Sequence, residues 1–345
     1  MNGPEKGRTA IAHGEMNLLA IRLARLGDVI LLLPTLAAIA KSTDARVTLL
    51  TDSRIAPIAR LCPAIADVVE VDRVAIRDGN KIQSAIQLVK LVSAVRRPKF
   101  DTVIDFHSFR ETNLLALLSG AKVRLGLQRS EGAYLGSCFN RPPIPEDKSI
   151  HVSQMFHRIA EAALGGTNVP SVSQVLHIPE AVDRKISSLL PTAPRVTLYV
   201  DAPVRDRRWP PEHFAALADY VLEELHAEVL VISSSSNRGL AQQVRRASQH
   251  PEKVQILTEL TLQELAAAIR TSTLLVSNDT GPMHLGPVLG VPTVGLFSVG
   301  LPEHYRPFGG NDRYLRKCPM EDLPACQVIQ EVNQLWLIAG RGLQR

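Results

Sequence analysis

The segment Arg22–Asp28 (RLARLGD) joins an apolar run to an apolar helical pattern and ends in a carboxylate. Gly27 permits a tight turn, which puts Asp28 in the first turn of the helix. An Asp at this position can cap the helix, a contribution of about 1 kcal/mol. It can also accept the proton of an attacking hydroxyl. The sequence leaves both roles open for Asp28, and one side chain can fill both.

A second polar turn, Ser277–His284 (SNDTGPMH), follows another apolar run. Pro282 suits the first turn of a helix, and the free N–H groups of such a turn attract a phosphate. The ring of His284 can reach the same anion, and Asp279 can bind sugar hydroxyls. The structural alternative is a capped turn with a satisfied histidine. So dense a polar turn after an apolar strand favours a binding site.

Two further turns carry basic side chains. Three arginines stand before Trp209 in Arg205–Pro211 (RDRRWPP), and at the start of a helix they can clamp an anion. A solvated basic turn is the alternative there. The segment His107–Arg110 (HSFR) also follows an apolar run. A capped turn and a binding site for an acceptor molecule are equally compatible with it.

The elements that must position these turns alternate along almost the whole chain, as in parallel, doubly wound α/β sheets. The strands that we expect are Leu18–Leu23, Val47–Thr51, Val68–Val71, Thr102–Phe106, Arg195–Val200, Val229–Ser233, Thr273–Ser277 and Thr293–Phe297. The helices that we expect are Val29–Ala40, Ile82–Val95, Asn113–Leu118, Val152–Leu164, His213–Leu225, Leu240–Ala247, Leu262–Ile269, Met283–Leu289 and Val328–Ala339. Because ligands of such sheets bind beyond the carboxyl ends of the strands, all four turns face a predicted site.

The length of 345 residues and the 45% of hydrophobic residues predict two domains, each with its own core. We expect a loose tail over residues 1–16, with Met1 or Met16 as the start of the protein. Residues 17–168 and 180–325 form the two Rossmann-like domains, which face each other across a cleft. The Gly- and Pro-rich stretch Gly165–Pro179 is the expected linker, and 326–345 the final helix.

The composition and the absence of several known motifs disfavour some classes of function. The net charge of +5 suits an anionic partner or simple solubility, and 4% of aromatic residues disfavours binding of single-stranded nucleic acid. The sequence has no G-x-G-x-x-G after the first strand of either half, no Walker A motif, no H-E-x-x-H and no D-x-D. Hydride transfer, NTP hydrolysis and zinc chemistry are therefore disfavoured. A diphosphate would have to be held by Arg, Lys, His and helix N-termini, without a metal.

The four turns together resemble the heptosyltransferase family, glycosyltransferase family 9, whose inverting enzymes build the inner core of lipopolysaccharide. Arg25-Leu26-Gly27-Asp28 resembles the opening motif of that family, and Arg207-Arg208-Trp209-Pro210 resembles its basic-Arg-Trp-Pro turn. Asp279–Leu285 is closely similar to its donor motif, and Ser108-Phe109-Arg110 to a Ser-Phe-basic stretch of some members. The resemblance runs from about Asn17 to Ala339.

The resemblance implies a GT-B fold that needs no metal and no cofactor, with acceptor and donor bound by the first and second domains. It also implies that the final helix returns to the first domain, and that Asp28 is the catalytic base. The implied donor is a nucleotide sugar such as ADP-heptose. The residues implied for the donor are Arg207, Arg208, Asn237, Asp279, Thr280, Gly281, Pro282, Met283 and His284. Those implied for a lipid-linked or free glycan acceptor are Arg25, Gly27, His107, Ser108 and Arg110. A cytoplasmic enzyme is implied, with peripheral contact to the inner membrane and no nucleic-acid partner.

Three positions depart from the family pattern. Arg207 stands where Lys is frequent, and Asp201-Ala202-Pro203 replaces a phosphate turn of small residues. Asn237 stands near a Glu that serves the donor ribose in other members, after a run of four serines in place of Gly-Gly. These departures bear on the identity of the sugar nucleotide. The alternatives to a transferase are a nucleotide-sugar epimerase and a non-catalytic nucleotide-sugar binding protein on the same fold.

Overall fold

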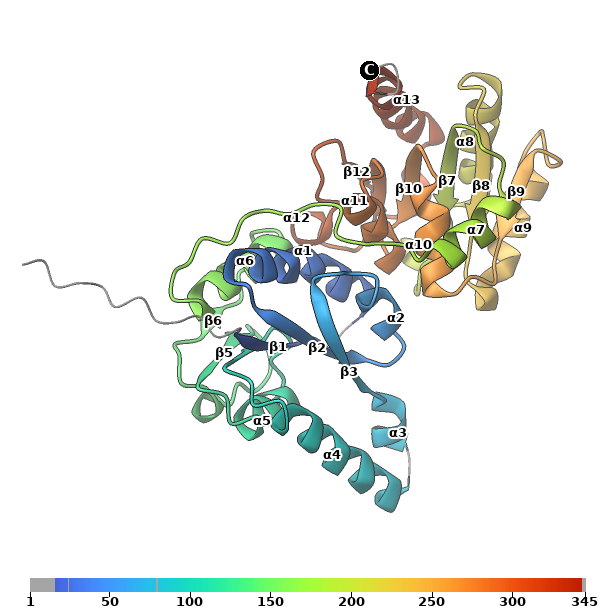
Figure 1. The fold of residues 1–345 in the computed structure, drawn as a ribbon. Helices are drawn as coiled ribbons and strands as arrows, with labels where there is room; N and C mark the ends of the chain where they lie inside the picture. Colours follow the sequence, from blue (N-terminus) through green and yellow to red (C-terminus); the bar gives the residue numbers. More distant parts are fainter. Residues whose placement is uncertain (1–15, 24, 79, 343–345) are drawn as a thin grey trace, which may run out of the picture.

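A computed structural model of the chain describes residues 16–23, 25–78 and 80–342. In this part of the chain two parallel sheets of six strands occur, in the orders β3-β2-β1-β4-β5-β6 and β12-β11-β10-β7-β8-β9. When each sheet is counted from its own first strand, both have the doubly wound Rossmann order. The two sheets form two separate bodies (Figure 1). The predicted fold, two Rossmann-like domains, is therefore confirmed. The predicted tail, residues 1–16, lies outside the described residues except for Met16.

The first domain carries the elements up to residue 163. Its elements are β1 (Asn17–Ile21), α1 (Leu26–Thr43), β2 (Arg46–Asp52), α2 (Ala56–Ala59), β3 (Ile65–Val71), α3 (Arg73–Asp78), α4 (Lys81–Arg96), β4 (Thr102–Asp105), α5 (Arg110–Leu118), β5 (Val123–Gln128), the 3-10 turn η1 (Gly136–Cys138), β6 (Ile144–Pro145) and α6 (Val152–Ala163).

The second domain carries the elements from residue 180 onward. Its elements are α7 (Glu180–Leu189), β7 (Arg195–Tyr199), η2 (Arg205–Arg207), α8 (Pro211–Glu223), β8 (Glu228–Ile232), η3 (Ser235–Asn237), α9 (Arg238–Ala247), β9 (Val254–Leu257), α10 (Leu262–Arg270), β10 (Leu274–Asn278), η4 (Gly281–His284), α11 (Leu285–Leu289), β11 (Thr293–Phe297), α12 (Pro302–Tyr305), β12 (Arg313–Arg316), η5 (Met320–Asp322) and α13 (Ala325–Gly342).

Helix α1 is the central helix of the first domain. It packs against α6 and β2, and ten of its eighteen residues are buried. This packing explains why its sequence is apolar. By length and composition alone this helix could cross a membrane, but 56% of the apolar window is buried inside the protein. The burial is that of a core helix. Its N-terminus follows β1 directly and points to the cleft between the domains.

The two domains meet through helices at the cleft. α1 packs against η4 and α11 of the second domain, and α2 packs against α10. One buried apolar cluster is continuous across this contact, from Leu18 and Ile30 in the first domain to Leu265 and Leu285 in the second. The donor and acceptor motifs therefore lie on two bodies that share a packed interface.

The position of the final helix, α13, differs from the predicted one. In its described part it packs against α8, β10 and β11 of the second domain, where Val328, Val332 and Leu335 are fully buried. Figure 1 shows it on the far side of that domain from the first sheet. The expectation that this helix returns to the first domain is therefore wrong. The apolar spacing predicted a buried face, but not which sheet would bury it.

Candidate active site

The opening motif of the first domain and the donor motif of the second touch each other. A Cβ atom built on Gly27 would lie 2.7 Å from Cδ2 of His284, and one on Gly281 would lie 3.1 Å from the backbone nitrogen of Gly27. Both positions therefore need glycine, because the backbones of α1 and η4 approach too closely for a side chain. The two turns, whose glycines Gly27 and Gly281 lie 254 positions apart in the sequence, form one site at the cleft.

Asp28 lies in the first turn of α1 and is held by a residue that our sequence analysis did not single out. Nη2 of Arg22 lies 3.0 Å from Oδ1 of Asp28, and the two side chains are 3% and 14% exposed. Arg22 also donates a hydrogen bond to the carbonyl of Phe106 and stacks over the ring of Phe156. The N-cap position belongs to Arg25, and no side chain caps the helix. Asp28 is thus not the cap, and its carboxylate is oriented by a buried arginine.

His284 is buried at the contact between the domains. Burial, with a smaller repulsion from His151, lowers the pKa of His284 to about 3 against the opposing effect of Asp28. Its ring is therefore neutral at pH 7. It lines a cavity of about 500 Å³ between α1, α6 and α11, next to Leu31, His157 and Val288. The ring that the sequence predicted to reach a bound anion would therefore act there as a neutral hydrogen-bonding group.

A second cavity, of about 640 Å³, lies where the strands of the second sheet end against the start of α1. Arg207 and Asp279 form an ion pair there, with 3.2 Å between Nη1 and Oδ2. Burial raises the pKa of Asp279, and Arg207 and Arg25 oppose that shift. The residues that line this cavity include Arg25, Leu26, Gly27, Tyr199, Pro203, Val204, Arg207, Ser233, Ser234, Asp279, Thr280, Gly281 and Pro282. Arg25 and Gly27, which the resemblance assigned to the acceptor, thus lie in the cavity of the donor motif.

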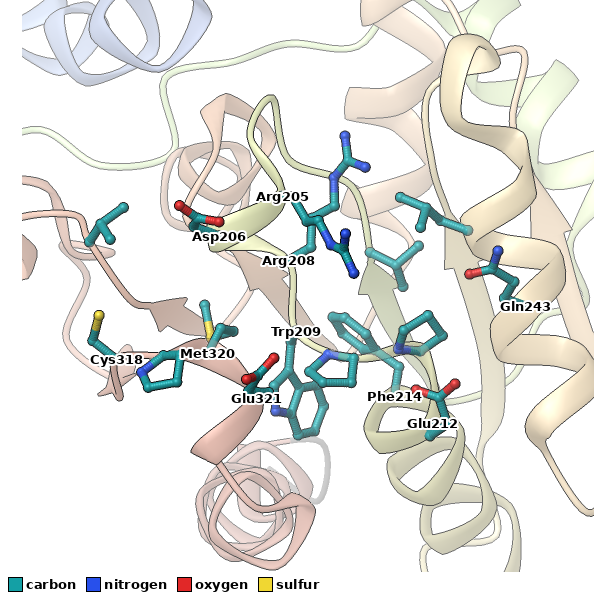
Figure 2. A pocket seen from close by; sticks show the side chains of 16 residues that line it. Arg205, Asp206, Arg208, Trp209, Glu212, Phe214, Gln243, Cys318, Met320 and Glu321 are labelled. Atoms are coloured by element: carbon teal, nitrogen blue, oxygen red, sulfur yellow. The ribbon is translucent and has the colours of Figure 1, made fainter.

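The arginines of the turn line two different cavities. Arg207 faces the 640 Å³ cavity, whereas Arg205 and Arg208 line another cavity of about 590 Å³ next to Trp209. Figure 2 shows both arginines among the side chains around this cavity, together with Gln243 from α9. Trp209 is 1% exposed and its indole donates to the carbonyl of Leu323, which anchors the turn. Arg207 and Arg208 are adjacent in the sequence, but they line different cavities.

Asp201 ties the end of β7 to the start of α9. Its carboxylate accepts hydrogen bonds from Nδ2 of Asn237 at 3.1 Å and from the backbone of Ser234 at 3.2 Å. Nη2 of Arg208 lies 3.7 Å away from it. Asp201 was missed as a site residue because it stood out only as a departure from the family pattern. Asn237, predicted to bind the donor, points its amide group to this carboxylate.

The predicted acceptor turn is built around a buried carboxylate at the end of β4. Asp105 accepts from the backbones of His107 at 3.0 Å and Ser108 at 2.7 Å, and from Nδ2 of Asn113 at 2.9 Å. Ser108 has a φ of 54°, a strained conformation that these bonds hold in place. Burial, with repulsion from Arg22 and other arginines, lowers the pKa of His107 to about 3. This turn is therefore rigid, and its histidine is neutral at pH 7.

The turn and Asp28 belong to one constellation, because Arg22 bridges from the carboxylate of Asp28 to the carbonyl of Phe106. Nε of Arg129 donates to the carbonyl of His107 at 2.9 Å, which adds a second cation beside the turn. Arg110, by contrast, is exposed at the first position of α5. The first domain thus presents a basic, rigid surface next to the candidate base.

The chain was compared with known protein families and with solved structures. The family model described as glycosyltransferase family 9 (heptosyltransferase) matches residues 88–336, well over half of the chain. The chain belongs to glycosyltransferase family 9. It is therefore a glycosyltransferase of the heptosyltransferase family, and the resemblance seen in the sequence is confirmed.

Individual members of the family are distant relatives. Lipopolysaccharide heptosyltransferase 1 of Pseudomonas aeruginosa is 24% identical over 308 residues, which are 87% of this chain and 83% of that protein. Among solved structures, a family 9 glycosyl transferase from Veillonella parvula has a TM-score of 0.82 at 24% identity, covering 93% and 97% of the two chains. The E. coli heptosyltransferase WaaC with ADP has a TM-score of 0.77 at 19% identity, covering 93% and 100%. These likenesses support the GT-B fold.

Proposed function

We propose that this family 9 enzyme transfers a heptose from ADP-heptose to a hydroxyl of a lipopolysaccharide core or a similar glycan. The transfer inverts the anomeric centre and needs no metal. The observation that carries the proposal is the contact between Gly27 and His284, which joins the turn of Asp28 to the donor motif. A relative, the E. coli heptosyltransferase WaaC, has been solved with ADP, which supports ADP as the nucleotide.

In this proposal the donor occupies the 640 Å³ cavity. Its diphosphate lies against the N–H groups at the start of α1, which attract an anion, and against Arg207. Arg25, the N-cap of that helix, adds a second cation. Asp279, held by Arg207 at 3.2 Å, binds hydroxyls of the sugar. The nucleoside extends toward the ends of β7 and β8, where Asp201 and Asn237 can bind ribose hydroxyls.

The acceptor hydroxyl attacks the anomeric carbon from the face opposite the diphosphate. The new glycosidic bond forms as the bond to the diphosphate oxygen breaks, and Asp28 takes the hydroxyl proton. Negative charge grows on the departing ADP, where preorganised donors such as Arg207 and the helix N-terminus stabilise it. Arg22 keeps the carboxylate of Asp28 in a fixed orientation through this step.

The acceptor lies on the first domain, beside the turn of His107 and Ser108. The partly exposed cation Arg129 beside this turn favours an acceptor with negative charge, such as a lipid-linked core sugar. With a lipid-linked acceptor, the enzyme would act in the cytoplasm at the inner face of the inner membrane, through peripheral contact.

Calorimetry with ADP, UDP, GDP and CMP, with and without EDTA, tests the proposal. We expect ADP to bind most tightly and EDTA to leave its affinity unchanged, and ADP-heptose to be consumed only when acceptor is present. Tighter binding of another nucleotide would mean that the donor sugar is carried by that nucleotide and not by ADP. Loss of binding in EDTA would refute metal independence, and consumption of donor without acceptor would favour an epimerase.

A further inference from the structure

Helix α4 carries apolar side chains on the face that it turns to solvent. Ile82, Ile86 and Val89 are 74%, 48% and 69% exposed, and their spacing of four and three residues places them on one face of the helix. The opposite face holds α4 on its domain through Leu91 and Val95, which belong to one buried cluster with residues of β1. A contiguous exposed apolar stripe of this kind marks a surface that meets a partner.

The same segment is rich in cations and lacks carboxylates. Between residues 81 and 99 the sequence has no Asp or Glu. Its five cations are all exposed and are Lys81, Lys90, Arg96, Arg97 and Lys99. Arg96 follows Val89 by seven residues, so the apolar stripe ends on a cation of the same face. Apolar side chains flanked by Lys and Arg are typical of helices that lie in a membrane interface, with their charges among the lipid headgroups.

The position of α4 leaves the stripe accessible and close to the predicted acceptor turn. α4 packs against α3 and α5, and Figure 1 shows α4 and α5 on the side of the first domain that faces away from the second domain. α5 begins at Arg110, directly after the turn of His107 and Ser108. Three leucines of α5 are also exposed, Leu114, Leu117 and Leu118. A lipid-linked acceptor in a bilayer beneath these helices would be near the turn that we expect to bind it.

We propose that α4 lies in the headgroup layer of an anionic lipid bilayer, with Ile82, Ile86 and Val89 inserted among the lipids. The cations of residues 81–99 lie against the lipid phosphates. This inference rests on the proposed function, because it assigns the surface through which the enzyme contacts the membrane that holds its acceptor.

The charge of α4 favours a bilayer over a second copy of the chain as the partner. In a symmetric dimer both copies use the same patch. Two copies joined through α4 would therefore set the same five cations against each other, and like charges brought together at an interface oppose binding. An anionic bilayer provides the opposite charge and an apolar layer at once.

Removal of the apolar stripe is the first test, measured by co-sedimentation with vesicles of equal parts phosphatidylcholine and phosphatidylglycerol. Ile82→Ser, Val89→Ser removes the two most exposed apolar side chains of α4. This double variant should bind at least about tenfold more weakly than the wild type, because two inserted side chains are lost. The control is Leu337→Ser, Ile338→Ser, which changes two exposed apolar side chains of α13 and should bind as the wild type does.

Removal of cations is the second test, with the same vesicles. Arg96→Gln, Arg97→Gln should weaken binding about fivefold for each cation removed. The control is Arg245→Gln, Arg246→Gln, which removes two exposed cations from the last turn of α9 and should leave binding unchanged. Wild-type binding should also weaken as salt is raised and in vesicles of phosphatidylcholine alone. All four double variants change exposed side chains, so circular dichroism should match the wild type.

Vesicle binding needs neither ADP nor an acceptor, so it tests the surface apart from the reaction. Wild-type protein that stays in solution, or α4 variants that bind as tightly as their controls, would overturn the proposal. Sedimentation velocity adds a second check: a wild-type dimer that Ile82→Ser, Val89→Ser converts to a monomer would assign the stripe to a second copy and also overturn it. ADP affinity should be equal in all these variants. A wild type that binds vesicles but neither binds ADP nor transfers sugar would refute the proposed function instead.

Discussion

Replacing Gly27 by alanine probes the contact that joins the two halves of the site. The new Cβ would lie 2.7 Å from Cδ2 and 3.2 Å from Nε2 of His284, and 3.3 Å from the Cα of Gly281. An ordinary contact begins at 3.4 Å, so the ring must move by about 0.7 Å, the difference from 2.7 Å. His284 is 5% exposed, and the Cα of Gly281 is backbone that cannot rotate away, so α1 and η4 must separate slightly.

The magnitude follows from two opposing effects. Overpacking a tight contact costs about 1–3 kcal/mol of unfolding free energy, and alanine regains at most about 1 kcal/mol over glycine in a helix. We therefore expect a net loss of about 1 kcal/mol. Activity should suffer more, because a misplacement approaching 1 Å costs about 10²-fold in rate. Urea unfolding gives the first quantity, and kcat with ADP-heptose and acceptor gives the second.

Gly239→Ala is the matched control. Gly239 is also in the first turn of a helix, α9, but a Cβ there would meet no atom within 4 Å. This variant should keep wild-type activity and be equally or slightly more stable. If Gly27→Ala behaved like Gly239→Ala in both assays, the close approach of α1 and η4 would not be needed and the reasoning would fail.

Three further variants test separate parts of the site. Arg207→Met should weaken ADP binding by about 10-fold or more in calorimetry, since charged hydrogen bonds contribute about 1.5–3 kcal/mol, whereas Arg205→Met should not. Arg22→Met should lower kcat and reduce stability in urea, because it leaves the carboxylate of Asp28 without its buried partner. The pKa of His107 is lowered to about 3 in the folded protein. As pH falls below about 6.5, this histidine therefore becomes protonated in the unfolded chain while it stays neutral in the folded protein. Stability should therefore fall from pH 7 to pH 5, and His107→Gln should remove up to about 2 kcal/mol of that loss; identical losses in both proteins would contradict the shift.

The sequence predicted much of the fold because most strands are short apolar runs. Every predicted strand and helix overlaps an observed element. The strand β12 was missed because its four residues, Arg313–Arg316, are two arginines around Tyr314 and Leu315, with no fully buried side chain, at a sheet edge. The strand β5 was missed because Gly126 and Arg124 interrupt its apolar pattern. Helix Met283–Leu289 begins earlier than predicted, as the 3-10 turn η4, since Gly281 and Pro282 already adopt helical geometry.

The site was only partly predictable, because tertiary contacts decide where neighbouring side chains point. The donor and opening motifs were recognisable from their strand-turn-helix pattern. The division of Arg207 from Arg208 was not, since an irregular turn sends adjacent residues to opposite sides. Arg22 was inconspicuous beside an apolar strand, and its partner Asp28 is six residues away. The hydrogen bonds of His151 and His304 between the domains join residues more than 150 positions apart, for which the sequence carries no local signal.

The most direct test of the central claim is the turnover of Asp28→Asn, measured together with its affinity for ADP. If Asp28 accepts the acceptor proton, kcat should fall by about 10²–10⁴-fold. The affinity for ADP should stay within a few-fold of the wild type, because Arg207 and the start of α1 remain in place. Turnover near the wild-type rate would contradict the assignment of Asp28 as the base.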